Sequence, residues 1–124
     1  MRFITSAALA AVACASAATA FAQPAHLTDV QFVAANRCLG LMSSKTIGTP
    51  DAVTLSRFLR SESVGRMPLA YDEADQARDT ALRQANHSSS DSNARLIAER
   101  DGACRQFIDD AATTAAAAHP AHSS

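Results

Sequence analysis

The sequence predicts an all-α protein: a small up-and-down bundle of about four helices, held together by one disulfide. Three observations favour this fold class. Apolar residues recur at helical spacing along most of the chain. Only four glycines and few β-branched residues are present, which is too few for the turns and strands of an all-β sandwich. Two cysteines, Cys38 and Cys104, fall on predicted helices, and a length of 124 residues suits one domain.

Residues 1–22 are predicted to be a secretory signal peptide. The segment carries one basic residue near its start, continues as an uncharged stretch of apolar and small residues over 3–18, and ends in Ala20-Phe21-Ala22 before Gln23. This is the A-x-A pattern at which signal peptides are cleaved. We therefore expect a mature protein that starts at Gln23 and is periplasmic or secreted.

Two other interpretations of this segment stay open. The first is an uncleaved N-terminal anchor, although the apolar stretch is shorter than the roughly 20 residues of a membrane span. The second is lipidation of Cys14, although Ala11 stands where a bacterial lipobox normally has Leu. In the main interpretation Cys14 is removed with the signal peptide.

The first predicted helix covers residues 28–42. Thr28 and Gln31 form a capping box, and Leu27 and Phe32 are placed as a hydrophobic staple. The residues expected to face the core are Val30, Ala34, Cys38 and Leu41.

The second predicted helix covers residues 50–63. Thr49 is its expected N-cap, Pro50 its first helical residue, and Asp51 lies where the helix dipole favours a carboxylate. Gly65 is placed to end it. The expected core residues are Ala52, Leu55, Phe58 and Leu59.

The third predicted helix covers residues 68–86 and has two distinct faces. Alanines line the inward face: Ala70, Ala74, Ala77, Ala81 and Ala85, flanked by Leu69 and Leu82. The opposite face is charged: Asp72, Glu73, Asp75, Arg78, Asp79 and Arg83. Asp79 and Arg83 have the i,i+4 spacing of a helical ion pair.

The last predicted helix covers residues 92–112, after a polar loop. Gly102 lies inside it, at a cost of about 1 kcal/mol relative to Ala. Its expected seam is Ala94, Ile97, Cys104, Ile108 and Ala111, widened by Leu96, Ala103 and Phe107. The helical domain is thus expected over residues 23–112, followed by a disordered Ala/His tail, 113–124.

Cys38 and Cys104 are predicted to form a disulfide. Both lie on apolar helix faces, the compartment is expected to be oxidising, and no third cysteine remains in the mature chain. In an up-and-down bundle the first and last helices are antiparallel neighbours, which allows the Cα atoms to come within about 7 Å.

Three groups of residues have side chains that could carry chemistry. His87, Ser88–Ser90 and Asp91 contain the residue types of a hydrolytic triad, but adjacent residues in one loop do not readily adopt triad geometry. Asp72, Glu73, Asp75 and Asp79 are expected to form a solvated charged face. His26, His119 and His122 lack the four well-placed ligands of a structural zinc site. We therefore predict no metal site and no cofactor.

The charge and the absent motifs disfavour several functions. With 11 basic and 12 acidic residues, the formal charge of −1 argues against a nucleic-acid partner. None of the zinc-protease, C-x-x-C, P-loop, dinucleotide or nucleophile-elbow motifs occurs, so an enzyme is not expected.

The expected function is binding of a protein or envelope component, with no stable membrane span after signal removal. The alternative is a periplasmic acid or stress holdase-type chaperone, whose 12 carboxylates would lose charge in acid and loosen the bundle. The overall plan resembles small single-disulfide helical proteins of the bacterial periplasm, acid-stress chaperones among them, which is a likeness of architecture alone.

Overall fold

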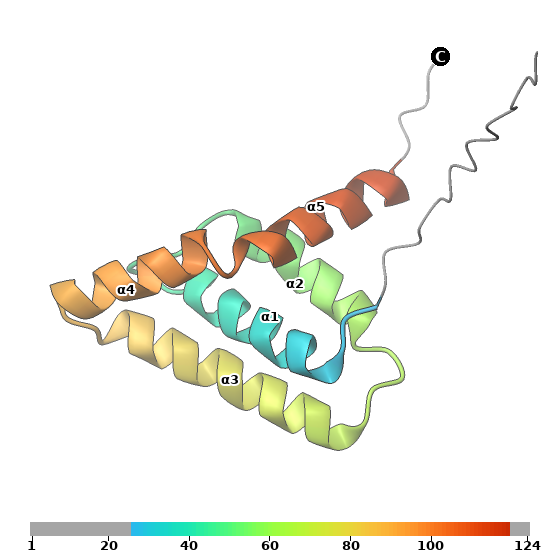
Figure 1. Cartoon of the computed structure of the whole chain (residues 1–124), viewed down its shortest axis with the longest axis horizontal. Coiled ribbons are helices and arrows are strands. Elements are labelled where there is room, and N and C mark those ends of the chain that lie inside the picture. The colour runs from blue at the N-terminus through green and yellow to red at the C-terminus, as the bar shows by residue number, and fades with distance from the viewer. Residues whose placement is uncertain (1–25, 120–124) are drawn as a thin grey trace, which may run out of the picture.

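Five α-helices make up residues 26–119, the part of the chain that this computed structural model describes (Figure 1). They are α1 (Asp29–Met42), α2 (Asp51–Glu62), α3 (Pro68–Asn86), α4 (Ser90–Asp101) and α5 (Arg105–Ala118). These residues contain no strand, so the all-helical class is confirmed, with five helices where about four were predicted. The predicted signal peptide and its cleavage residues lie outside the described part of the chain.

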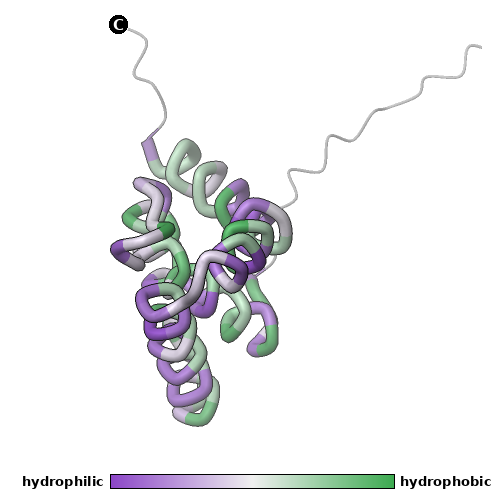
Figure 2. Tube along the Cα trace, turned by 90° about the vertical axis from the view of Figure 1, so that its left-hand side faces the viewer, coloured by the Kyte–Doolittle hydropathy of each residue, from purple (hydrophilic) through white to green (hydrophobic). Residues whose placement is uncertain are grey.

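The central helix is α1, with α3 along one side and α4 along the other (Figure 1). α1 and α3 run parallel, because the ring of Phe32 meets that of Tyr71 near their starts and the Thr46 hydroxyl donates to the Ala85 carbonyl near their ends. α2 and α4 run in the opposite direction to α1, and α5 packs against α2. Hydrophilic and hydrophobic residues alternate around the helices in Figure 2, as expected of amphipathic helices.

Small residues let α1 and α3 approach closely. The buried residues of α3 are the predicted alanines Ala70, Ala74, Ala81 and Ala85, while Ala77 is half-buried. Gly40 of α1 packs against them. A Cβ at Gly40 would lie 3.0 Å from the Ala81 Cβ and would overlap the backbone carbonyl oxygen of Arg78. Only glycine therefore fits at this point of contact.

The inward face of α1 differs from the predicted stripe. The capping box of Thr28 and Gln31 is present as predicted. Val30, however, is 81% exposed, whereas all residues from Cys38 to Met42 are buried. Three helices, α2, α3 and α4, contact α1, so its burial is not confined to one face. A single apolar stripe describes a helix that packs on one face, and α1 is packed on several.

The start of α2 also differs from the prediction. Pro50 occupies the N-cap position without a side-chain hydrogen bond, and the helix begins at Asp51. The backbone N–H of Thr49 donates instead to the Met42 carbonyl at 3.0 Å, which ties the loop to the end of α1. The Thr49 hydroxyl is buried and has no hydrogen-bond partner among the described residues. Gly65 has a positive φ of 81° and lies in the turn that follows α2.

The predicted helix over 92–112 is interrupted. α4 ends at Asp101 with Gly102 as its C-cap, and α5 follows Cys104. Glycine disfavours the helix interior, and the break allows α5 to turn onto α2. The predicted seam is confirmed at Cys104, Phe107 and Ala111, which are buried, and in part at Leu96 and Ile108, which are half-buried against the core. Ala94 and Ile97 of α4 and Ala103 in the break are exposed.

α5 continues through residues 113–118, which were expected to belong to a disordered tail. Four consecutive alanines end this helix, and alanine has the highest helix propensity of any residue. Residues 120–124 lie outside the described part of the chain.

Cys38 and Cys104 form the predicted disulfide, with their Cα atoms 5.6 Å apart. Both cysteines are buried. The bond joins α1 to the α4–α5 break. α4 itself has no buried residue and is held to α1 by polar contacts, such as the bidentate pair of Arg37 and Glu99 at 2.5 and 2.9 Å.

Arg66 joins the start of α1 to the α2–α3 turn. Its guanidinium donates to the Leu27 carbonyl and to Asp29, both at 2.6 Å, and to the Glu62 carbonyl at 2.7 Å. It also lies over the Phe32 ring, 4.4 Å from the centroid. The Arg66 side chain is only 9% exposed, so its bonds to the two carbonyls are partly shielded from water, whereas the Asp29 carboxylate is 62% exposed.

Arg66→Lys is expected to lower the free energy of unfolding by roughly 1–2 kcal/mol, because an ammonium cannot reproduce the planar, multiply donating geometry of the guanidinium. Chemical denaturation of both proteins measures the change. The matched control is Arg105→Lys in α5, since Arg105 is exposed and pairs with Asp109 only at the surface. Equal midpoints for Arg66→Lys and wild type would contradict this account of the turn.

Candidate functional site: a groove over α1

A groove runs along α1 between α2 and α3, and each helix lines it with one stripe of residues. We call it the α1 groove. Its floor is formed by Phe32, Asn36, Leu39 and Ser43 of α1, which follow helical spacing and so share one face. One wall, from α2 and the residue after it, is Ala52, Ser56, Arg60 and Ser63. The other wall, from α3, is Tyr71, Asp75 and Arg78.

Two adjoining cavities make up the α1 groove. The cavity at the Ser43 end has a volume of about 430 Å³, and the one at the Phe32 end about 200 Å³. They share four lining residues, Leu39, Ser56, Arg60 and Arg78, and therefore lie next to each other. The floor combines the apolar Phe32 and Leu39 with the polar Asn36 and Ser43, and hydroxyl and guanidinium groups lie along its edges.

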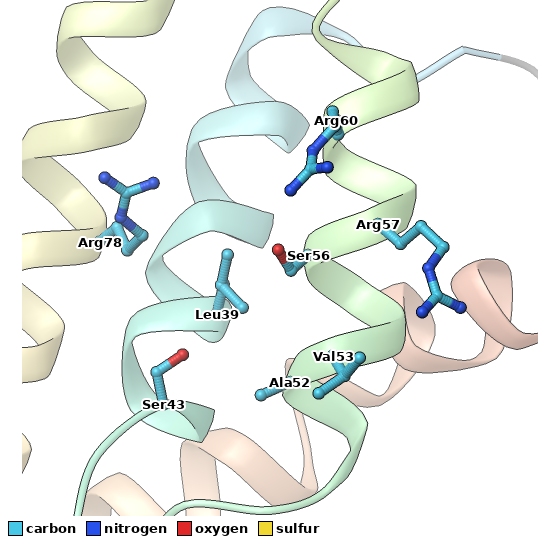
Figure 3. Close-up of a pocket in the computed structure, with 8 residues that line it drawn as sticks. All are labelled: Leu39, Ser43, Ala52, Val53, Ser56, Arg57, Arg60 and Arg78. Carbon is cyan, nitrogen blue, oxygen red and sulfur yellow. The ribbon is translucent and has the colours of Figure 1, made fainter.

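Two arginines face each other across the α1 groove. In Figure 3, Arg60 reaches over it from α2 and Arg78 from α3, with Leu39 and the Ser56 hydroxyl between them. Arg57 contributes to the same wall, but its guanidinium points away toward α5 (Figure 3). The arrangement can donate several hydrogen bonds to one group placed between Arg60 and Arg78.

The charges of these two arginines are balanced differently. Arg78 pairs with Asp75 at 3.1 Å and with Asp79 at 3.7 Å. Arg60 forms no salt bridge with any residue that the structure describes. The middle of the α1 groove therefore carries positive charge, although the chain as a whole has a formal charge of −1.

Two other cavities are present among the described residues. One, of about 190 Å³, lies between α2 and α5 and is mostly apolar, with Phe58 and Ala111 among its lining residues. The other, of about 480 Å³, lies beside the α3–α4 turn, where Arg37 is already occupied by Glu99 and Gln84. The α1 groove is framed by three helices and has two arginines that face each other across it.

The segment with triad residue types serves as two helix caps. The backbone N–H of His87 donates to the Arg83 carbonyl at the end of α3, and the Ser89 hydroxyl accepts the Ser92 N–H at the start of α4. Asp91 lies in the first turn of α4. No hydrogen bond between described residues joins the His87 imidazole to a serine or aspartate of this segment. The structure thus gives His87 and Ser89 the role of caps, while Ser90 and Asp91, which were expected in the loop before residue 92, already belong to α4.

The acidic residues of α3 are divided between solvent and Arg78. Asp72 and Glu73 are exposed, while Asp75 and Asp79 both contact Arg78. The predicted pair of Asp79 and Arg83 is wrong, because Arg83 reaches the Thr80 hydroxyl at 3.4 Å. Arg78, which lines the α1 groove, contacts both the Asp75 and the Asp79 carboxylates.

Within residues 26–119, no group of three or more His, Cys, Asp or Glu side chains is placed to hold a metal ion. The Nδ1 atom of His26 lies 3.1 Å from a Glu62 oxygen, and His119 is exposed after α5. His122, the third histidine of the candidate clip, lies outside the described part.

Comparisons with protein-family models, with curated proteins and with solved structures find no match to this chain. The function is therefore argued from its own residues. Among the helices described, none is both long and apolar enough to cross a membrane.

Sequence reasoning identified Arg78 as part of a charged face but did not identify the α1 groove. Arg60 was missed because a single arginine on an amphipathic helix is normally a solvated residue. A signal was present, since Ala52, Ser56 and Arg60 repeat at a spacing of four between the buried positions of α2. What the spacing alone could not supply is the neighbour that α2 faces, which depends on the parallel packing of α1 and α3.

Proposed function

We propose that this protein is exported and acts by binding a protein or envelope component in the α1 groove, without catalysis. The observation that carries the proposal is the pair of Arg60 and Arg78 facing each other over a partly apolar floor, on a chain that is otherwise slightly acidic. Binding sites commonly combine an apolar lining with a few placed polar groups. The disulfide supports export, because such bonds persist mainly in oxidising compartments.

Export is tested by sequencing the N-terminus of the protein recovered from the periplasm or medium of a bacterial host. The expected first residue is Gln23, as the Ala20-Phe21-Ala22 pattern predicts. An intact Met1, or a lipid-modified Cys14 at the new terminus, would contradict the proposed processing and would support one of the two alternatives.

Binding in the α1 groove is tested by retention of an envelope extract on the immobilised mature protein. We expect one saturable component, identified by mass spectrometry, that excess soluble protein displaces. Arg60→Glu should abolish its retention, whereas Arg83→Glu should not. The Arg83→Glu substitution changes the net charge by the same amount, but Arg83 is exposed and lines none of the cavities described above. Equal retention by both variants would contradict a role for the groove.

One observation favours the second candidate function, a holdase-type chaperone active in acid. Several large apolar side chains are exposed in the folded protein: Val30, Val53, Val64, Met67 and Leu69. Chaperones of this kind bind unfolded chains through such surface, and a looser bundle would expose more of it.

Acid is expected to loosen the protein below about pH 3, where most carboxylates lose their charge. The hydrogen bond from Arg100 lowers the pKa of Asp101 from its ordinary value of 3.8. A carboxyl group with a lowered pKa stabilises the folded state above that ordinary value, and its contribution is lost as the pH falls through the folded pKa.

The acid response is measured by the fluorescence of a hydrophobic dye and by the near-ultraviolet circular dichroism of Tyr71. We expect the dye signal to rise and the dichroism to fall below about pH 3, with helical content largely kept. Signals that stay unchanged down to about pH 2 would remove the support for the chaperone.

A further inference from the structure

We infer that the ligand of the α1 groove is an acidic peptide segment, bound in extended conformation with a carboxylate between Arg60 and Arg78. This inference rests on the proposed function, since it names the class of ligand for the same groove. It follows from the charge, the length and the pattern of polar groups along the groove.

The charge of the groove favours a negatively charged ligand. Arg60 has no carboxylate partner among the described residues, and it faces a second guanidinium. Arg78 is already paired with Asp75 and Asp79, so the charge that a ligand would balance is chiefly that of Arg60. Carboxylates match this arrangement well, because a guanidinium donates two parallel hydrogen bonds to a carboxylate. The Ser56 hydroxyl lies between the arginines and can donate a further one.

The length of the groove favours a chain over a small ion. Its floor runs from Phe32 to Ser43, which corresponds to about 16 Å of helix. An extended peptide of about five residues spans the same distance. Apolar lining continues beyond the arginine pair toward the Ser43 end, where Ala52 is half-buried and Val53 is 62% exposed, while Phe32 and Leu59 line the other end from buried positions. An inorganic anion would leave this surface uncovered.

The polar groups are spread along the groove and not gathered at one end. Ser43, Ser56 and Ser63 occur at successive points of it. This suits a peptide, whose backbone amides need partners at regular intervals, more than an acyl chain, which needs an unbroken apolar lining. The expected ligand therefore alternates apolar and acidic side chains, with the acidic ones directed to the arginines.

The test is fluorescence anisotropy with the mature protein and a fluorescein-labelled peptide, Leu-Asp-Leu-Glu-Leu. The matched probe is its amide analogue, Leu-Asn-Leu-Gln-Leu. We expect saturable binding of the acidic peptide and at least about tenfold weaker binding of the amide analogue. Added salt should weaken only the first. Arg60→Glu should remove the preference for the acidic peptide, and Arg83→Glu should keep it.

A second variant separates loss of the groove from loss of charge. Ser56→Leu fills the space between the arginines without changing the net charge, so it should weaken both peptides. Wild-type circular dichroism and melting behaviour are required of each variant before its binding is compared.

Three outcomes would overturn the inference. Equal affinities for the acidic and amide peptides would exclude a carboxylate between the arginines. Saturable binding of inorganic phosphate, lost in Arg60→Glu and measured by calorimetry against sodium chloride of equal ionic strength, with no binding of either peptide, would assign the groove to a phosphate-bearing ligand. Binding only to vesicles of an anionic phospholipid, sensitive to Arg60→Glu, would assign it to a membrane surface. In the last two cases retention from the extract would still depend on Arg60, so the proposed function would survive.

Discussion

Replacing Cys38 and Cys104 together by Ala is expected to lower the free energy of unfolding by roughly 2–4 kcal/mol. The bond closes a loop with a sequence separation of 66 residues and so restricts the unfolded chain strongly. A domain of this size has a total stability on the order of 5–10 kcal/mol. The double variant should therefore melt well below the wild type, by more than about 10 °C.

The effect is expected to be uneven along the chain. α4 has no buried residue; the Arg37–Glu99 pair joins it to α1, and Arg100 donates to the Ile47 carbonyl in the loop between α1 and α2. Without the disulfide, amide hydrogens of α4 should exchange faster than those of α3, whose alanine face stays packed on α1.

Thiol titration of the unfolded, unreduced mature protein provides the direct control. It should detect no free thiol in the wild type. Two free thiols per chain would refute the bond itself. An unchanged melting curve for the double variant would show that the disulfide, although present in the wild type, contributes little to its stability.

Gly40→Ala is expected to destabilise the protein by roughly 3 kcal/mol, although alanine is the better helix former by about 1 kcal/mol. The added Cβ overlaps the carbonyl oxygen of Arg78, which belongs to the backbone and cannot rotate away. α1 and α3 must separate, and the alanine packing between them is lost.

The control for Gly40→Ala is the pair of Gly40→Ala with Ala81→Gly. Removing the Ala81 Cβ relieves a 3.0 Å approach but not the overlap with the Arg78 carbonyl, so the double variant should not recover stability. Chemical denaturation measures both. A Gly40→Ala protein as stable as wild type would show that the two helices do not approach as closely as described. Because Arg78 would move with α3, the variant should also lose the preference for an acidic ligand.

Features set by neighbouring residues were predictable from the sequence. The capping box at Thr28, the alanine face of α3 and the pairing of Cys38 with Cys104 all follow from local spacing and from the number of cysteines. The features that failed depend on tertiary neighbours. Val30 is exposed, although the stripe to which it was assigned has the correct spacing, because the burial of α1 is decided by three surrounding helices.

The break between α4 and α5 was only partly predictable. Gly102 was noted as unfavourable in a helix, but a single glycine is tolerated in many helices. Here the chain must both bring Cys104 to Cys38 and lay Phe107 and Ala111 on α2, which a straight helix does not achieve. The α1 groove escaped prediction for the same reason: its walls come from helices that are distant in sequence.

Mapping the bound surface by nuclear magnetic resonance tests the central claim most directly. Isotope-labelled mature protein is titrated with the acidic peptide, and the shifts of its backbone amide signals are followed. The account predicts that the largest shifts fall on the three stripes of the α1 groove, around Ser43, Ser56, Arg60 and Arg78. Shifts centred on Phe58 and Ala111 between α2 and α5, or saturation of the protein with no shift in the α1 groove, would contradict it.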